Sequence, residues 1–495
     1  MKKIRVQNYR AIEDSGMLDL KPITIAVGRN SAGKSSFVRL FPLLKQTLER
    51  KIAEPILWYG DYVDFGDFKH TVSKLNNENP IKISFEIDAE DKRLGRLNSF
   101  VEIDKMPVTI VLSIREKFFD NITITFYDQI IEIDIDQNQK ASVTINGENL
   151  CSTDKEVYAE SVVGDIIPRL CEKTSSGYYP ISFPDLLQKC HKYIWGNNVK
   201  QDRGWFGYYD DINIKLGSKD KILSQLKKIN KERFEGKRIS HKRFLKYNNY
   251  ILAIKLYDLI RVINGTVTYD MHNTSYIKPI RAMVDRYYRV QGVSIDEIDA
   301  DGSNLPMILH NMSEKELNEF EKWSKDKFGI IFSVITTEGH ISLVIKKELD
   351  SEEKTNVADT GYGYSQMLPI VMLLWMIHNS KRSKFMRKME KTVVIEQPEL
   401  HLHPAYQAKM MDVFVNILKE ARNKGVDLKI IFETHSETMI NRLGTLVALG
   451  VIGNEDISIL IFDKDQYVTK ICSKTYDKQG ILTGWPVDFF APEDI

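Results

Sequence analysis

The sequence predicts an α/β protein in which both ends of the chain build one sheet, with an antiparallel β lobe and a large, mostly helical insertion between those ends. Three patterns support this fold class. A strand, a glycine-rich loop and a helix follow one another over residues 22–48. Short alternating apolar runs fill residues 80–147. Apolar strands alternate with helices over residues 392–462, as in a largely parallel sheet that is covered on both faces.

We accordingly expect four segments along the chain. The two halves of the sheet domain occupy residues 1–75 and 336–495. The β lobe occupies residues 76–150, and the helical or irregular insertion occupies residues 151–335. No long heptad array is visible in the sequence, which argues against a coiled-coil arm between the two halves.

Individual elements follow from the local patterns. Near the N-terminus, we expect strands at residues 3–8 and 22–28 and a helix over residues 35–48. The lobe strands are expected at residues 81–87, 108–114, 122–126 and 130–135. Towards the C-terminus, we expect strands at residues 341–346, 392–395, 428–432 and 457–462, and a helix at 404–424.

Composition bounds the class of protein. The 495-residue chain is long enough for two or three domains. Its net charge of +1 gives no global bias towards nucleic acid or membranes, so any basic surface must be local. There is no apolar run long enough to span a bilayer, and no signal-peptide pattern. The four cysteines form no C-x-x-C pair, so we expect a reduced, cytoplasmic protein.

Residues 28–36 match the phosphate-loop pattern G-x-x-x-x-G-K-[ST]. Backbone N–H groups of such a loop face the phosphates of a nucleotide. Lys34 is expected to reach the β and γ phosphates, and Ser35 to ligate Mg²⁺. The alternative is a chance glycine-rich turn before a helix, which the flanking strand and helix disfavour. ATP and Mg²⁺ are therefore the expected cofactors.

A second set of candidate residues follows two apolar strands. Glu396 ends the strand at 392–395, where a carboxylate typically binds Mg²⁺. Gln397 follows it, and an amide can orient a water molecule but cannot take its proton, so hydrolysis of ATP is expected to be slow; Glu399 is a substitute base. His435 follows the next strand and is placed to contact a γ-phosphate. An ordinary strand end and a surface histidine are the alternatives.

A glycine-rich segment, residues 359–366, precedes a long apolar helix and contains Gly363, Ser365 and Gln366. Glycines and a serine before a helix N-terminus make an anion site. Since one phosphate loop already serves the β and γ phosphates, this segment most simply serves the γ-phosphate of a neighbouring subunit's ATP. The alternative is a loop that only caps the helix.

The order of these motifs resembles that of the ABC-type ATPases of the SMC, RecF and overcoming-lysogenisation-defect class. The matching residues are G-x-N-x-x-G-K-S-S from Gly28, D-x-G-x-G-x-S-Q from Asp359, I-E-Q-P-E-L-H-L-H-P from Ile395, and E-T-H-S-E from Glu433. In that class, two subunits close on two ATP molecules. Each nucleotide lies between one subunit's Walker motifs and the other subunit's signature loop.

The resemblance implies a role for each matched residue. The Walker A motif would include Asn30, Gly33, Lys34, Ser35 and Ser36. Glu396 would be the Walker B acid, and Gln397 stands where the catalytic Glu is usual. Gly363, Ser365 and Gln366 would belong to the signature motif, and His435 would be the switch histidine. Arg10 would lie near the nucleobase. Residues 61–67 would form the Q-loop, although they lack its usual Gln.

A narrower resemblance is to the PtuA-type ATPases of the Septu and retron antiphage systems. It rests on residues 276–281, 285–288 and 484–490. It implies a separately encoded HNH nuclease (PtuB-like) as partner, and in retrons a reverse transcriptase with its RNA–DNA element. No H-N-H arrangement is visible in this chain, so no intrinsic nuclease is expected. The alternative is an SMC/RecF/OLD-like repair ATPase or nuclease that acts on DNA by itself, using Asp463 and Asp465.

Basic and aromatic clusters give weaker signals. Residues 215–246 contain twelve Lys or Arg against three acidic residues, a pattern that either contacts DNA or RNA phosphates or forms a solvated face. The aromatic cluster at 205–209 either stacks on bases or is buried. His401 and His403 invite a metal interpretation, but turn residues near a dimer interface are favoured.

Overall fold

The computed structural model describes residues 1–90, 105–150, 156–174, 177–196, 214–292, 295–380, 389–465 and 468–482. The chain forms two compact units. The first unit comprises Met1–Asp19 and Leu43–His272, and the second comprises Leu20–Pro42 and Asn273–Ile495. In this division residues 20–42 group with the C-terminal part of the chain, whereas residues 1–19 and 43–75 group with the lobe. The tail motif at 484–490 and the aromatic cluster at 205–209 lie outside the described residues.

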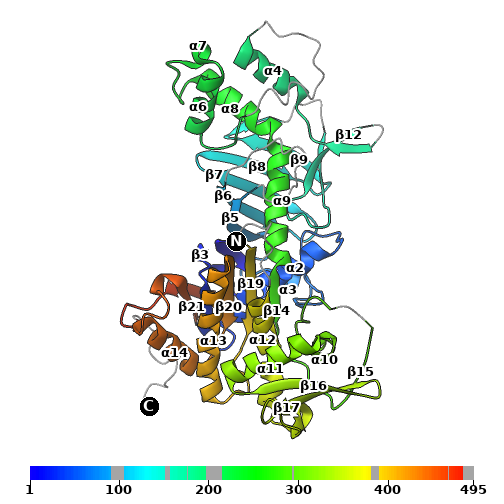
Figure 1. Cartoon of the computed structure of the whole chain (residues 1–495). Coiled ribbons are helices and arrows are strands. Elements are labelled where there is room, and N and C mark those ends of the chain that lie inside the picture. Colours follow the sequence, from blue (N-terminus) through cyan, green and yellow to red (C-terminus); the bar gives the residue numbers. More distant parts are fainter. Residues whose placement is uncertain are drawn as a thin grey trace. The chain divides into compact units, whose positions relative to one another are not determined.

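The second unit is built on a sheet whose first five strands are parallel (Figure 1). In spatial order these are β14 (Thr274–Ile277), β19 (Met389–Glu396), β20 (Val426–Glu433), β4 (Ile23–Gly28) and β21 (Ile457–Asp465). The strand β22 (Val468–Lys474) follows as an antiparallel hairpin partner of β21. Every residue of β4 is buried, as expected for a strand covered on both faces. The predicted parallel sheet is therefore confirmed.

Helices and a small second sheet complete the second unit. The helices of this unit are α1 (Lys34–Val38), α10 (Leu305–Asn311), α11 (Glu314–Phe328), α12 (Tyr362–Asn379), α13 (Pro404–Asn423) and α14 (Glu437–Ala448). The helix α2 (Leu40–Glu49) begins in the second unit and continues into the first, which resumes at Leu43. The antiparallel strands are β15 (Tyr288–Arg289), β16 (Ile331–Thr337), β17 (His340–Lys346) and β18 (Lys354–Asn356). The single helix expected over 35–48 is two helices, because the turn at Arg39 ends α1.

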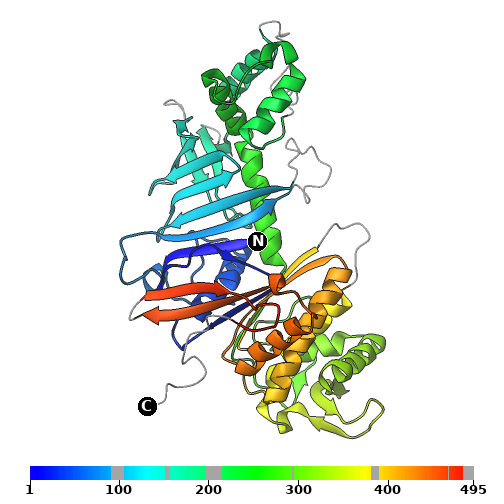
Figure 2. The same cartoon turned by 90° about the vertical axis from the view of Figure 1, so that its left-hand side faces the viewer.

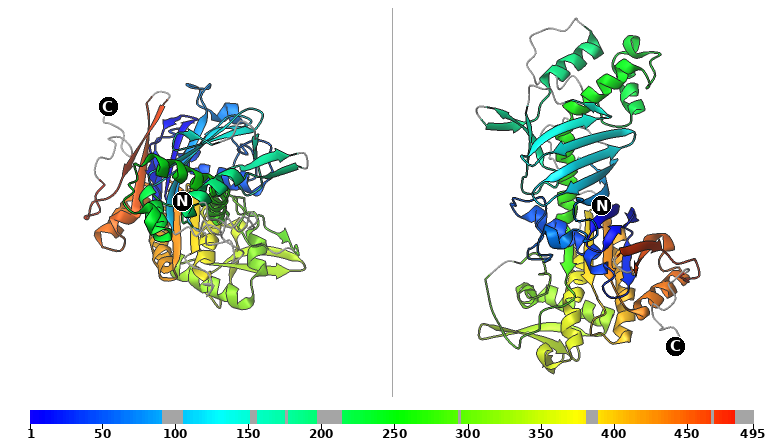
Figure 3. Two further views of the ribbon diagram at one scale, coloured as in Figure 1. Left: turned by 90° about the horizontal axis from the view of Figure 1, so that it is seen from above. Right: turned by 180° about the vertical axis from the view of Figure 1, so that it is seen from behind.

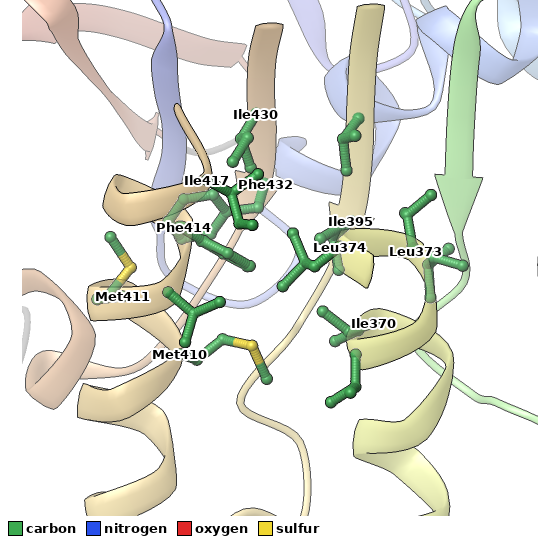
Figure 4. Packing of buried hydrophobic residues seen from close by; sticks show 14 of the residues in the cluster. Ile370, Leu373, Leu374, Ile395, Met410, Met411, Phe414, Ile417, Ile430 and Phe432 are labelled. Carbon is green, nitrogen blue, oxygen red and sulfur yellow. The ribbon is translucent and has the colours of Figure 1, made fainter. Parts of the chain in front are cut away.

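The hydrophobic core of the second unit lies between helices α12 and α13 and the parallel sheet. Leu374 of α12 and Phe414 of α13 pack towards Ile395 of β19 and Phe432 of β20 (Figure 4). All four side chains are almost completely buried. Each such side chain contributes about 1.5–3 kcal/mol through burial, so this core fixes the ends of the strands that carry the candidate site.

The first unit contains the predicted antiparallel lobe (Figure 2). Its neighbouring strands are β1 (Lys3–Tyr9), β5 (Ile81–Ala89), β6 (Met106–Ile114), β7 (Phe119–Phe126), β8 (Gln129–Ile135), β9 (Lys140–Ile145), β11 (Val157–Glu160), β12 (Arg169–Thr174) and β13 (Gly177–Pro180). The short strands β2 (Ile12–Asp14), β3 (Leu18–Asp19) and β10 (Glu148–Asn149) pair with β1 or β9. The strands β11, β12 and β13 extend the lobe into the segment expected to be mostly helical.

Helices make up the rest of the first unit (Figure 3). They are α3 (Phe68–Thr71), α4 (Pro184–Trp195), α6 (Lys219–Ile229), α7 (Lys231–Phe234), α8 (Lys242–Ile254) and α9 (Leu256–His272). A separate apolar cluster joins α4, α6, α7 and α8. Within the described residues, no helix is both long enough and apolar enough to cross a bilayer.

Candidate functional site

The phosphate loop lies between β4 and α1, as the sequence predicts. Gly28 ends β4, and a Cβ atom there would approach the backbone oxygen of Phe462 on β21 to 2.3 Å. Gly33 precedes α1 with φ of 94°, in the left-handed region that favours glycine. No side chain caps the first turn of α1. Both glycines are therefore required by the backbone, one for close strand packing and one for the loop's left-handed turn.

Lys34 folds back over its own loop. Its Nζ donates to the carbonyl oxygens of Gly28 and Arg29, at 3.0 and 2.9 Å. Burial lowers the pKa of Lys34, while the carboxylates of Glu433 and Glu399 oppose that shift. The ammonium group is thus held inside the loop, where a bound anion would replace the two carbonyl oxygens as its hydrogen-bond acceptor.

Ser35 contacts a carboxylate that sequence reasoning did not assign. Its Oγ donates to Oε1 of Glu433 at 3.0 Å. Glu433 is the last residue of β20, and it stands beside Ala26 of β4 in the sheet register. Burial raises the pKa of Glu433, and the hydrogen bond from Ser35 opposes that shift. The position of Glu433 directly after a buried strand was the one signal in the sequence for this role.

Glu396 is bound on both oxygens by neighbouring side chains. Arg39 donates from Nε to Oε1 and from Nη2 to Oε2, each at 2.8 Å. The hydroxyl of Tyr276 donates to Oε1 at 2.5 Å. Burial would lower the pKa of Arg39, but the hydrogen bond and charge of Glu396 raise it. The role of Glu396 at a metal ion stays a prediction, and the structure shows it as the centre of a buried ion-pair network.

Gln397, Glu399 and His435 lie around the same strand ends. The backbone N–H of Gln397 donates to the carbonyl of Glu433 at 3.0 Å, and its Nε2 lies 3.4 Å from Oε1 of Glu433. Oε1 of Glu399 accepts from the backbone N–H of His435 at 2.7 Å. Burial raises the pKa of Glu399. Burial, together with the charge of Lys34, lowers the pKa of His435, which favours the neutral imidazole.

Arg281 links the glycine-rich segment to the end of β19. Its Nη2 donates to the carbonyl oxygens of Glu396 and Gln397, at 3.0 and 3.3 Å. Its own backbone N–H donates to the side chain of Gln366, at 3.3 Å. Burial lowers the pKa of Arg281 to about 10. The segment 276–281, quoted above only for its resemblance, thus supplies two side chains to the candidate site.

The glycine-rich segment itself forms the N-terminus of α12. Ser365 Oγ donates to the carbonyl of Tyr362 at 2.8 Å, within the first turn. A Cβ atom at Gly363 would come within 2.8 Å of the carbonyl oxygen of His401. His403 caps α13 by accepting from the backbone N–H of Ala405. No group of three or more His, Cys, Asp or Glu side chains suited to a metal occurs in the described part of the chain.

Several other predicted residues lie away from these contacts. Asn30 is exposed and Ser36 is half-buried on either side of Gly33. The guanidinium of Arg10 lies 4.9 Å from the ring centroid of Phe65 in the first unit. Asp463 and Asp465 are exposed at the end of β21. The predicted roles of all five remain predictions.

The basic run at 215–246 lies on α6, α7 and α8 in the first unit. Part of it packs on aromatic rings. Lys237 lies 4.8 Å from the ring centroid of Phe234, and Arg243 lies 5.3 Å from that of Tyr193. These cations cover apolar surface, which accounts for part of the run without nucleic acid. Binding of DNA or RNA by this surface stays a prediction.

Fold and loop together define a P-loop nucleotide-binding protein, and comparison with known families agrees. The profile of the AAA ATPase domain matches residues 1–440. The chain therefore belongs to the AAA ATPase domain family, whose nucleotide is ATP, usually with Mg²⁺. The side chains around the phosphate loop fit ATP with Mg²⁺, because they combine a hydroxyl, a cation and an acid. These are Ser35, Lys34 and, from the end of β20, Glu433.

Comparison with curated proteins gave no match. Among solved structures, the chain is similar to an SMC head bound to the C-terminal winged-helix domain of ScpA, at 10% identity and a TM-score of 0.35, covering 96% of this chain and 98% of that one. The chain is also similar to an SMC head domain from Pyrococcus furiosus, at 10% identity and a TM-score of 0.36, and the match covers 96% of each chain. Its similarity to an SMC head domain from Thermotoga maritima has 8% identity and a TM-score of 0.32, and the match covers 95% of this chain and 97% of that one.

Proposed function

We propose that this chain is the ATP-binding, slowly hydrolysing ATPase subunit of a cytoplasmic antiphage complex of the Septu or retron type, and that it controls a separately encoded HNH nuclease. Membership of the AAA ATPase domain family supports the nucleotide part. The order of the motifs supports an ABC-type subunit. The defence assignment rests on the narrower resemblance at residues 276–281 and 285–288.

The observation that carries the proposal is the placement of Lys34 and Ser35 beside a buried carboxylate, within one compact unit. When ATP and Mg²⁺ are bound, the metal neutralises charge on the phosphates. Lys34 would hold the β and γ phosphates, and Ser35 would ligate the metal. The imidazole of His435 would meet the γ-phosphate, and the amide of Gln397 would orient water without accepting its proton.

We further propose that two copies of the chain close on two ATP molecules. Each copy would then offer its residues 363–366 to the nucleotide held by the other. In the described structure, Gln366 and Arg281 connect that segment to the end of β19. A nucleotide bound at β19 and β20 would therefore bias the position of the segment that meets the partner copy.

Replacement of Lys34 by alanine tests the nucleotide part. We expect ATP affinity to fall at least about tenfold and the ATP-dependent dimer to disappear, because the loop loses the buried side-chain cation that its own carbonyl oxygens hold. Fluorescent ATP titration and analytical ultracentrifugation measure the two effects. Lys315→Ala, which removes an exposed lysine on α11, is the matched control. Unchanged affinity and assembly in Lys34→Ala would refute the proposal.

Replacement of Gln397 by glutamate tests slow turnover. A positioned general base contributes roughly 10²–10⁴-fold. The new carboxylate would lie close to Glu433, since the Gln397 amide is 3.4 Å from that residue, and repulsion would keep part of it protonated. We therefore expect the rate of ATP hydrolysis to rise only about tenfold. A rate that falls would show that another residue, such as Glu399, already acts as the base.

Binding of the HNH nuclease is tested by mixing the two purified proteins with and without ATP. We expect a stable complex with ATP and a weaker one with Lys34→Ala.

The competing proposal is a repair ATPase or nuclease that acts on DNA alone, for which the exposed Asp463 and Asp465 are the candidate residues. Metal-dependent nicking of DNA by the chain alone, lost in Asp463→Ala, would favour that alternative.

A further inference from the structure

Two carboxylates end neighbouring strands beside the phosphate loop. Glu396 ends β19 and Glu433 ends β20, and the two residues are partners in the parallel register. Both side chains are buried, with exposed fractions of 1% and 2%. Either could supply the acid that holds a nucleotide-bound metal, so their remaining hydrogen-bond capacity decides between them.

The oxygens of Glu396 already have protein partners. Arg39 binds both oxygens through a bidentate pair, and Tyr276 donates to one of them. A bidentate guanidinium supplies the full charge and two well-aligned N–H donors that a carboxylate needs. A metal at Glu396 would have to compete with this cation for the oxygens of a buried carboxylate, and the half-buried Arg39 would lose its partner.

Glu433 differs on each of these points. Its Oε1 accepts from the hydroxyl of Ser35, the residue predicted to ligate Mg²⁺. Its Oε2 is buried and has no hydrogen-bond partner among the described residues. Such an oxygen calls for an explanation, because nearly all buried polar atoms in proteins are paired. The amide Nε2 of Gln397 also lies 3.4 Å from Oε1, so it does not pair with Oε2.

We propose that Glu433, with Ser35, forms the protein part of the Mg²⁺ site, and that Glu396 is a positioning residue held by Arg39 and Tyr276. Mg²⁺ in nucleotide sites is typically bound through one or two carboxylates, substrate phosphates and water molecules. A serine hydroxyl with a single carboxylate at 3.0 Å meets that requirement. The proposal rests on the proposed binding of ATP and names the acid that serves it.

The sheet order explains why the acid comes from β20. The strand β20 lies between β19 and β4 and pairs directly with β4, which leads into the phosphate loop. Glu433 is therefore one strand nearer to Ser35 than Glu396 is. The bidentate contact with Arg39, just after α1, then fixes the position of Glu396 relative to the loop without occupying the metal site.

The test measures binding of a fluorescent ATP analogue to the full chain in Mg²⁺ and in EDTA. For the wild type, we expect Mg²⁺ to tighten binding about tenfold. Glu433→Gln should lose the gain from Mg²⁺, which is measured as the ratio of its own affinities in the two buffers. Glu396→Gln should keep the gain, because the metal does not use that carboxylate. Electron paramagnetic resonance of Mn²⁺ with ATP adds a readout on the metal itself, and Glu433→Gln should release the bound Mn²⁺ signal.

The outcomes separate this inference from the proposed function. A full Mg²⁺ gain in Glu433→Gln, or its loss in a folded Glu396→Gln, would overturn the assignment of the metal to Glu433 while ATP binding stands. Failure of the wild type to bind the analogue in both buffers would overturn the proposed function, and this inference with it. If Glu433→Gln does not fold, Glu433→Asp replaces it, since the shorter carboxylate should reduce the gain, and an unchanged gain would contradict the proposal.

Discussion

Replacing Arg39 by leucine is expected to destabilise the second unit by about 3 kcal/mol, because it leaves the carboxylate of Glu396 buried and without its cation. Glu396 is only 1% exposed, so water cannot take over the role of the guanidinium. Arg39 itself is 31% exposed, which places the effect at the low end of the range for broken buried pairs. The apparent melting temperature should fall by about 6–12 °C.

A second ion pair in the same unit provides the matched control. Arg422 contacts both oxygens of Asp456, but its side chain is 65% exposed. Arg422→Leu should therefore change stability by at most about 1 kcal/mol. The double variant Arg39→Leu with Glu396→Gln should be more stable than Arg39→Leu alone, since no unpaired charge remains. Equal melting temperatures for Arg39→Leu and Arg422→Leu would contradict the argument.

Replacing Gly28 by alanine is expected to destabilise the same unit by about 3 kcal/mol through steric overlap. The new Cβ would lie 2.3 Å from the backbone oxygen of Phe462, which belongs to the neighbouring strand and cannot rotate away. The central strand β4 would have to move from β21, and the phosphate loop would move with it. Limited proteolysis and thermal unfolding measure the loss, and weaker ATP binding should accompany it.

The variant Gly450→Ala is the control that separates the overlap of the new Cβ atom from the cost of a positive φ. Gly450 also has a positive φ, of 67°, but nothing lies within 4 Å of its ideal Cβ position. Gly450→Ala should therefore cost only about 1–2 kcal/mol, the conformational penalty for a left-handed residue. If Gly28→Ala proved as stable as Gly450→Ala, the close approach of β4 and β21 would not constrain this position.

The elements of the fold were accessible from the sequence because their signals are local. The alternating runs between 81 and 135 and the apolar strands near the C-terminus appear as predicted, and so do the strand and loop before Lys34, although the helix after them is divided at Arg39. The strand β14 was missed, since its four residues include Thr274 and Ser275 and give no apolar run. Likewise, β11, β12 and β13 are short, and they are recognised only through their pairing with the lobe.

The partners within the candidate site were not accessible from the sequence. Ser35 and Glu433 are 398 residues apart, and Arg39 and Glu396 are 357 residues apart. Which acid meets which partner depends on the order of β19, β20 and β4 in the sheet, and no periodicity encodes that order. Motif position suggested Glu396 for the metal, whereas hydrogen bonding distinguishes its bound oxygens from the unpaired oxygen of Glu433.

The division of the second unit between the two ends of the chain has a consequence for biosynthesis. The strand β4, at Ile23–Gly28, pairs with β20 and β21, at Val426–Glu433 and Ile457–Asp465. A ribosome adding about 5–20 residues per second needs roughly 20–80 s to make the intervening chain. During that interval β4 leaves the ribosome as an apolar strand without neighbours, while residues 43–272 have all the chain they need to fold. Nascent chains should therefore acquire ATP-binding ability only at the end of translation, and chaperones that shield apolar strands should engage the first thirty or so residues.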